Sequence, residues 1–401
     1  MSRLDWFHAA RYGMFIHWGP YSVAARGEWV RNRERIPHEE YCSKFAERFL
    51  AENYNPQKWA QLAKTAGIGY VVLTTRHHDG FCLWDTKTTD FNAARIGPKR
   101  DLLKPYVEAL RKEGLKVGFY YSVADWHHAD YPNAYARDWP KNWPDRDARK
   151  RFIAFYRSQL EELMTGYGKI DLLWYDGCLP SPTAGDDTNE RIYELQPEIL
   201  INERNGEPFD FRVAEQHLNA KQGPWEAAFT LNDNWGYHAG DQNWKTPRQV
   251  IHHLITCAKN GGNFLLNVGP RGDGVIPEES VQILLACGDW LRRNRDFLAH
   301  CDRCSIGWNN WGLVSSRGSK VYLHLFESPG EELCFPEMAN RVKSARFLDG
   351  GCPVAFEQRE ERLFIRGLPT PLADPIATTI VLEIEGDLKL LQAHETFWIP
   401  A

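Results

Sequence analysis

The sequence predicts an α/β protein: an irregular (β/α)8 TIM-like barrel followed by a C-terminal antiparallel β-sandwich domain. Over roughly the first 300 residues, short apolar runs typical of strands alternate with amphipathic helical stripes, which is the pattern of a parallel barrel. Beyond about Asn309 the helical stripes stop, and short apolar runs recur between turns. We therefore expect a catalytic barrel over residues 1–305 and a sandwich over residues 306–401.

The barrel strands are predicted from short apolar runs bounded by glycine or polar residues, a pattern typical of strands buried on both faces. In chain order these runs are 13–16, 70–74, 115–122, 170–177, 199–202, 211–214, 228–231 and 263–268. The runs at 211–214 and 228–231 carry the weakest pattern.

Helices are predicted between most of these strands, at 56–66, 101–113, 149–164, 189–195, 246–258 and 280–295. The first is the clearest, because Asn55 can cap it, Pro56 suits its first turn and Gly67 ends it. No convincing helix follows the fifth or the sixth strand, so we expect the barrel to be irregular there. The mixed-charge segment 24–40 is predicted to form a solvated loop over the site.

The C-terminal part shows apolar runs without helical periodicity, at 321–326, 341–348, 362–365 and 379–384. The formal net charge of the chain is −5, which favours neither nucleic acid nor an acidic membrane surface as a partner. We see no signal peptide and no apolar stretch long enough to cross a membrane. Nine irregularly spaced cysteines agree with a reduced, cytoplasmic protein, and a homo-oligomer stays possible.

Asp176 ends the apolar run at 170–177 and shares a strand face with Leu172 and Trp174. A carboxylate at the carboxyl end of a buried strand is where an α/β barrel keeps its chemistry. An Asp followed by Gly, as at 176–177, is also common in turns. Taken alone, Asp176 is therefore explained equally well as a residue that caps the next loop.

Polar residues follow the other strands in the same way: His17, His77, His78, Tyr120, Tyr121, Arg204 and Glu215. In a parallel barrel the carboxyl ends of the strands share one face, so these side chains are expected to converge on Asp176 although they are distant in sequence.

Two carboxylates at one site permit cleavage of a glycosidic bond, with one ionised to attack and the other holding a proton for the leaving oxygen. Asp176 suits the nucleophile and Glu215 the proton donor, with Glu226 as a rival donor. Arg204 can hold Asp176 ionised, and Glu28 is a further candidate carboxylate. Aromatic side chains that can pack on a sugar ring are Trp18, Trp29, Trp84, Trp174 and Trp235.

Two other functions stay open on the residues alone. One is a metal-dependent hydrolase that uses His17, His77 and Asp79. Neutral imidazoles that bind sugar hydroxyls explain the same histidines without a metal. The other is a non-catalytic carbohydrate-binding protein, against which the presence of both carboxylates argues.

Several long motifs resemble the α-L-fucosidases of glycoside hydrolase family 29. They are RYGMFIHWG at 11–19, HHDGFCLWDTKTTDFN at 77–92, GFYYS at 118–122, LWYDG at 173–177 and GGNFLLNVGPRGDG at 261–274. The resemblance covers roughly residues 6 to 297.

The resemblance implies a retaining exo-glycosidase that removes terminal α-L-fucose from fucosylated oligosaccharides through a covalent fucosyl-enzyme, with no metal or cofactor. It implies Asp176 as nucleophile and Glu215 as acid/base. The residues that it implies for substrate binding are His17, Glu28, Trp29, His77, His78, Tyr120, Trp174, Arg204 and Trp235. The chain departs from the family in its short gap between His17 and Glu28, and its lack of a signal peptide points to cytoplasmic breakdown of imported oligosaccharides.

Overall fold

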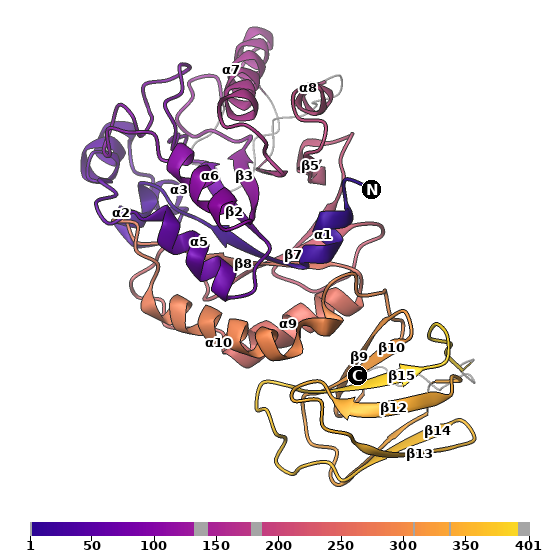
Figure 1. Cartoon of the computed structure of the whole chain (residues 1–401). Helices are drawn as coiled ribbons and strands as arrows, with labels where there is room; N and C mark the ends of the chain where they lie inside the picture. Colours follow the sequence, from indigo (N-terminus) through magenta and orange to yellow (C-terminus); the bar gives the residue numbers. More distant parts are fainter. Residues whose placement is uncertain (1, 132–142, 178–186, 308, 337, 392–401) are drawn as a thin grey trace. The chain divides into compact units, whose positions relative to one another are not determined.

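The computed structural model describes residues 2–131, 143–177, 187–307, 309–336 and 338–391 (Figure 1). The chain forms two compact units, Met1–Lys245 with Asn263–Gly288 and Thr246–Gly262 with Asp289–Ala401. Both units are discontinuous in sequence, so the domain boundary after residue 305 stays a prediction.

The first unit is built on one eight-stranded sheet with the order β5-β4-β3-β2-β1-β8-β7-β6, in which all paired strands are parallel. Its strands are β1 (Tyr12–Ile16), β2 (Tyr70–Arg76), β3 (Lys116–Ser122), β4 (Leu172–Asp176), β5 (Leu200–Ile201), β6 (Arg212–Glu215), β7 (Trp225–Thr230) and β8 (Asn263–Val268). Between β5 and β6 the ladder is replaced by a parallel bridge from Asn202 to Phe211. The predicted irregular TIM-like barrel is thereby confirmed.

Helices connect the first five strands of the barrel, as predicted. They are α5 (Pro56–Thr65), α6 (Leu103–Lys112), α7 (Arg146–Gly166) and α8 (Thr188–Leu195), and α1 (Asp5–Ala10) precedes β1. The Asn55 side chain accepts a hydrogen bond from the Lys58 amide and so caps α5. Between β5 and β6 the described chain forms only the 3-10 turn η2 (Glu203–Asn205), and none of its residues between β6 and β7 is helical.

The prediction of a solvated loop at 24–40 is wrong. This region contains α3 (Val30–Arg33) and the start of α4 (His38–Tyr41), between α2 (Tyr21–Ala24) and the π-helical turn η1 (Cys42–Ala46). Glu28 and Arg31 are buried. The Arg31 guanidinium donates to the carbonyl oxygen of Asp79 at 2.8 Å. Charged side chains can be buried when such bonds satisfy them, and composition alone does not reveal this.

Aromatic side chains from the strands fill the barrel interior beneath the site. The Phe15 ring lies 5.1 Å from that of Trp174, and Trp174 stacks on Tyr120 at 5.8 Å. Phe7 of α1 packs against Phe211 at 5.1 Å, so α1 extends the same apolar cluster. The strand ends above this cluster are therefore held on a closely packed aromatic base.

The second unit is a β-sandwich of two antiparallel sheets around one apolar core. One sheet has the order β12-β15-β10-β9 and the other β11-β14-β13. The strands are β9 (Gly312–Arg317), β10 (Lys320–Leu325), β11 (Glu332–Phe335), β12 (Val342–Phe347), β13 (Ala355–Arg359), β14 (Arg362–Arg366) and β15 (Thr378–Ile384). The predicted sandwich is confirmed, but the sequence pattern missed β9, β11 and β13.

Two longer helices and a short turn complete the described fold. Helix α9 (Pro247–Lys259) begins with a capping box in which Thr246 and Gln249 exchange hydrogen bonds. Helix α10 (Glu278–Asn294) is followed by the 3-10 turn η3 (Arg295–Phe297). Across the described ranges, no helix combines the length and the apolar character needed to cross a membrane.

Candidate active site

A pocket of about 210 Å3 lies at the carboxyl ends of the barrel strands. It is smaller than the roughly 300–1,000 Å3 of pockets for drug-sized ligands, so it suits a small group such as one sugar ring. Its lining residues are Phe15, His17, Glu28, Trp29, His77, His78, Trp174, Asp176, Arg204, Glu215 and Trp235. The catalytic and substrate-binding residues that the resemblance implies all line the pocket except Tyr120, whose hydroxyl donates to Asp176. The gap between His17 and Glu28 is short. Glu28 and Trp29 nevertheless line the pocket.

Asp176 is the last residue of β4, and its side chain is 18% exposed. The Tyr120 hydroxyl donates to its Oδ2 at 2.9 Å, and the Arg204 guanidinium donates to its Oδ1. Burial alone would raise the pKa of the Asp176 carboxyl, but Arg204, the Gly177 amide and Tyr120 together hold that pKa below its ordinary value. Asp176 is therefore ionised at neutral pH and aimed into the pocket.

Arg204 joins the two predicted catalytic carboxylates. One of its terminal nitrogens bonds Asp176 and the other bonds Glu215, while the guanidinium lies 4.9 Å from the centre of the Trp174 ring. The Glu215 side chain is 40% exposed, against 18% for Asp176. Asp176 thus lies deeper in the pocket than Glu215, and a single cation separates them.

Glu226, the rival proton donor, does not reach the pocket. It lies near the amino end of β7, is fully buried, and accepts a hydrogen bond from the Trp174 indole at 3.0 Å and another from the Tyr70 hydroxyl. Burial raises the pKa of its carboxyl to about 7. Of the two rivals, only Glu215 lines the cavity.

This raised pKa predicts how pH affects stability. The folded protein keeps the Glu226 proton over a range, from about 4.5 to about 7, in which the unfolded chain has lost it. This group therefore stabilises the fold fully at low pH, and that contribution falls as pH rises through the range. The Glu226→Gln variant has no ionisable group at this position, so it keeps the stability that wild type loses as pH rises between these limits. We therefore expect the unfolding free energy of the variant minus that of wild type to increase by on the order of 3 kcal/mol over this range. Urea unfolding at several pH values measures this, and parallel profiles would contradict it.

Three histidines line one side of the pocket and are neutral at pH 7. Burial lowers the pKa of both His17 and His78 to about 4, and it also lowers the pKa of His77. The His77 ring stacks on Tyr120 at 5.6 Å. Neutral imidazoles at these positions are suited to hydrogen bonding with hydroxyl groups.

The proposed metal set of His17, His77 and Asp79 is not assembled. The Asp79 carboxylate accepts hydrogen bonds from the Tyr41 hydroxyl at 2.7 Å and the Phe81 amide at 3.2 Å, outside the pocket. Within the part of the chain that the structure describes, the residues close enough to share a metal are His77, His78 and Asp176. Asp176 is already paired with Arg204, so a metal would have to compete with a fixed cation.

The aromatic walls come from three of the five predicted tryptophans. Trp29 packs against His78 at 5.3 Å, Trp235 lies 5.2 Å from His17, and Trp174 forms the floor. Trp18 and Trp84 are buried away from the pocket, contrary to the prediction. Their indoles donate to the Arg271 carbonyl and to Glu162 respectively.

Two contacts of the site were missed in the sequence. Phe15 lines the pocket from β1, and Trp126 packs on both Trp29 and His78, at 4.9 and 5.3 Å. The alternation of β1 could have placed Phe15 on the same face as His17. Trp126 lies in a loop, where no periodicity applies.

A sequence model of the α-L-fucosidase family matches residues 2–296, which include every predicted site residue. The chain belongs to the α-L-fucosidase family. It is similar to the tissue α-L-fucosidase of Bos taurus, with 31% identity over 368 residues that cover 81% of this chain and 75% of that protein. The resemblance seen in the motifs is confirmed.

Solved structures agree with this fucosidase over nearly its whole length. α-L-fucosidase isoenzyme 1 from Paenibacillus thiaminolyticus is 38% identical with a TM-score of 0.89, covering 96% of this chain and 99% of that one. A family 29 α-L-fucosidase from Bacteroides thetaiotaomicron, solved as a trapped covalent intermediate with 2-fluoro-fucosyl fluoride, is 28% identical with a TM-score of 0.87, covering 96% of each chain. The covalent intermediate in that relative is the hallmark of a retaining glycoside hydrolase.

Proposed function

We propose that this fucosidase is a retaining exo-glycosidase that removes terminal α-L-fucose from fucosylated oligosaccharides or glycoconjugates. One observation carries the proposal: Arg204 holds an ionised Asp176 inside a small pocket and a more exposed Glu215 at its open side. This pairs a buried nucleophile with a carboxyl group placed where a leaving oxygen and then a water can reach it.

The reaction uses these residues in two displacements. In the first, Asp176 bonds to the anomeric carbon, the bond from that carbon to the glycosidic oxygen breaks, and Glu215 gives its proton to the departing oxygen. In the second, Glu215 takes a proton from water, the water oxygen bonds to the anomeric carbon, and the bond to Asp176 breaks. Net retention of configuration follows from two inversions.

The lining of the pocket explains why one terminal sugar is taken. Trp29, Trp174 and Trp235 offer apolar surface to the ring and its methyl group, while His17, His77 and His78 face hydroxyl groups. Hydrolysis of an aryl α-L-fucoside, followed by NMR of the first sugar released, tests the function. We expect α-fucose as the first product, whereas β-fucose or no hydrolysis would contradict the proposal. The matching α-L-galactoside, which carries a hydroxyl on the methyl group, measures how strictly the methyl is required.

The role of Glu215 predicts a chemical rescue. In Glu215→Ala we expect kcat/KM to fall roughly 10²- to 10⁴-fold, because the leaving oxygen and the attacking water lose their proton partner. With an activated aryl substrate, added azide should restore turnover and give α-fucosyl azide, since azide attacks the fucosyl-enzyme with the second inversion and needs no base. Glu226→Ala is the control, and azide rescue of that variant instead of Glu215→Ala would overturn the assignment.

The preferred linkage and aglycone, the cytoplasmic location and a homo-oligomeric state stay predictions. A panel of fucosylated oligosaccharides with different linkages resolves the first of them most directly.

A further inference from the structure

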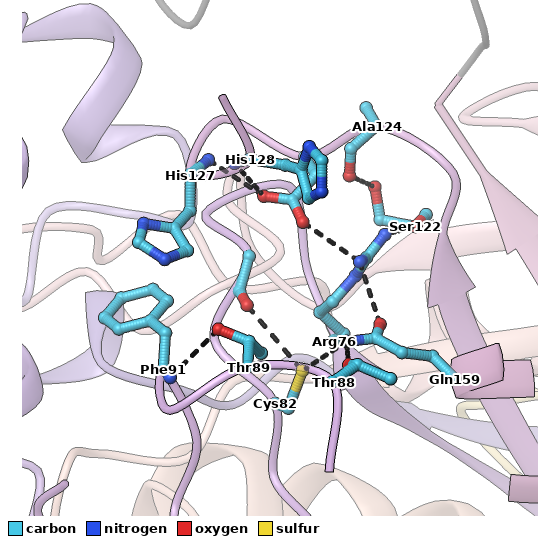
Figure 2. Close-up of polar contacts among 12 residues, drawn as sticks. Arg76, Cys82, Thr88, Thr89, Phe91, Ser122, Ala124, His127, His128 and Gln159 are labelled. Atoms are coloured by element: carbon cyan, nitrogen blue, oxygen red, sulfur yellow. Dashed lines mark hydrogen bonds and ion pairs between the residues drawn. The ribbon is translucent and has the colours of Figure 1, made fainter. Parts of the chain in front are cut away.

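Ser122, the last residue of β3, connects His78 to the backbone. Its hydroxyl lies 2.7 Å from His78 Nδ1 and donates to the carbonyl oxygen of Ala124 at 2.7 Å. Figure 2 shows this hydroxyl directed at Ala124. A serine hydroxyl has one proton, and a carbonyl oxygen can only accept. Because the proton of Ser122 points at Ala124, its oxygen must accept from His78, which places a hydrogen on His78 Nδ1.

Asn267 on β8 does the same for His17. Its amide nitrogen donates to the carbonyl oxygen of Trp235 at 2.7 Å, and its amide oxygen lies 2.7 Å from His17 Nδ1. The carbonyl of Trp235 can only accept, so the NH2 group must face it and the oxygen must face His17. His17 therefore also carries its hydrogen on Nδ1. Both Ser122 and Asn267 are buried.

We propose that Ser122 and Asn267 are positioning residues that lock His78 and His17 as Nδ1–H tautomers, so that both rings present an unprotonated Nε2 to the sugar. A neutral imidazole with a hydrogen on one nitrogen has a lone pair on the other. Both rings line the pocket, so the sugar hydroxyls that meet them must donate. The part of this inference that concerns sugar rests on the proposed function, whereas the tautomers do not.

The lock also withholds a further hydrogen-bond donor from the nucleophile. His78 Nε2 lies 3.6 Å from Asp176 Oδ2, which is longer than the roughly 2.7–2.9 Å of a charge-assisted hydrogen bond. An N–H at this nitrogen would donate to Asp176 and stabilise the carboxylate that has to attack. Because Ser122 holds the hydrogen on Nδ1, His78 does not donate to Asp176. The carboxylate is therefore more nucleophilic toward the anomeric carbon.

The tautomers can be read without substrate, from long-range proton–nitrogen correlation spectra of the 15N-labelled protein. The chain has 14 histidines, so His17→Asn and His78→Asn serve to assign the two rings. We expect both rings to show a protonated Nδ1 and an unprotonated Nε2 at neutral pH. A protonated Nε2 on either ring would overturn the lock for that ring, whether or not Ser122→Ala folds.

Ser122→Ala tests the cause. We expect His78 to lose its single tautomer and kcat/KM on an aryl α-L-fucoside to fall about tenfold, as for a lost hydrogen bond. Thr75→Val is the matched control, because Thr75 is a buried hydroxyl that donates to the Tyr120 carbonyl at 2.7 Å but is not bonded to a histidine. An unchanged His78 signal in Ser122→Ala, or an equal change in Thr75→Val, would overturn the assignment to Ser122.

Binding of free sugars tests whether the sugar hydroxyls donate hydrogen bonds to the histidines of the pocket. A deoxyfluoro analogue carries fluorine in place of one hydroxyl, and a deoxy analogue carries hydrogen there. At one or more hydroxyls of L-fucose away from the anomeric carbon, we expect the deoxyfluoro analogue to inhibit no better than the deoxy analogue, because fluorine cannot donate to Nε2. Deoxyfluoro sugars that inhibit as well as fucose at every remote position would contradict the inference. If the protein did not hydrolyse fucosides at all, the proposed function would fail while the tautomer measurement still decided the lock.

Discussion

Replacing Asp176 with alanine is expected to lower kcat on an aryl α-L-fucoside by about 10⁴-fold or more, the scale seen when an enzyme loses its nucleophile. The carboxylate is ionised, ends β4 and points into the pocket. Glu215 is on the far side of Arg204 and cannot form the same bond to carbon. Steady-state rates with enzyme of verified purity and unchanged circular dichroism measure the effect.

Asp79→Asn is the matched control for this variant. Asp79 is also a buried carboxylate close to the histidines, but its oxygens are taken by Tyr41 and the Phe81 amide. We expect its activity to stay within about tenfold of wild type, because no substrate group reaches it. Turnover of Asp176→Ala at the wild-type rate would remove Asp176 from the reaction, and a collapse of activity in Asp79→Asn would reopen the metal hypothesis.

The site could be predicted from sequence because of a rule about strand ends. His17, Asp176 and Glu215 lie far apart in the chain, but each stands at or just after the carboxyl end of its strand, and in a parallel barrel those ends share one face. Glu226 shows the limit of the rule. Its strand begins three residues earlier than predicted, which places Glu226 at the amino end and in the core.

Burial and loop contacts could not be predicted in the same way. Composition made 24–40 look solvated, yet Arg31 is buried against the backbone of Asp79, a residue distant in sequence. Strand β13 was missed because none of its residues is fully buried, so it lacks a clear apolar alternation. The hydrogen bonds of Ser122 and Asn267 depend on which donors and acceptors of neighbouring strands and loops lie beside them. This is known only once the residues are placed in three dimensions.

The ion pair between Arg76 and Asp125 predicts the largest effect on stability. Both side chains are buried, at 0% and 1% exposure, and their atoms lie 3.0 Å apart. Figure 2 shows Arg76 among its partners, which include the Gln159 amide oxygen at 2.9 Å. Removing one member of a buried pair leaves an uncompensated charge, so we expect Arg76→Met to lower the unfolding free energy by about 3–5 kcal/mol. Urea unfolding followed by tryptophan fluorescence measures the loss.

The same pair holds the loop that supports the pocket wall. Asp125 Oδ1 accepts from the amides of His127 and His128 at 2.8 and 3.0 Å, and the intervening Trp126 packs on Trp29 and His78. We therefore expect Arg76→Met to raise KM for an aryl α-L-fucoside as well, since the wall loses its support.

Two further variants distinguish the stability cost of an unpaired buried charge from the cost of losing the contact itself. Lys44→Met breaks an exposed pair with Glu40 and should change stability by no more than about 0.5 kcal/mol. Combining Arg76→Met with Asp125→Leu removes both charges, and apolar replacement of a whole buried pair is often close to neutral. We expect this double variant to recover part of the lost stability but not the KM, because Leu cannot bind the amides of His127 and His128. A double variant no more stable than Arg76→Met would show that the geometry of the loop, rather than the buried charge, sets the cost.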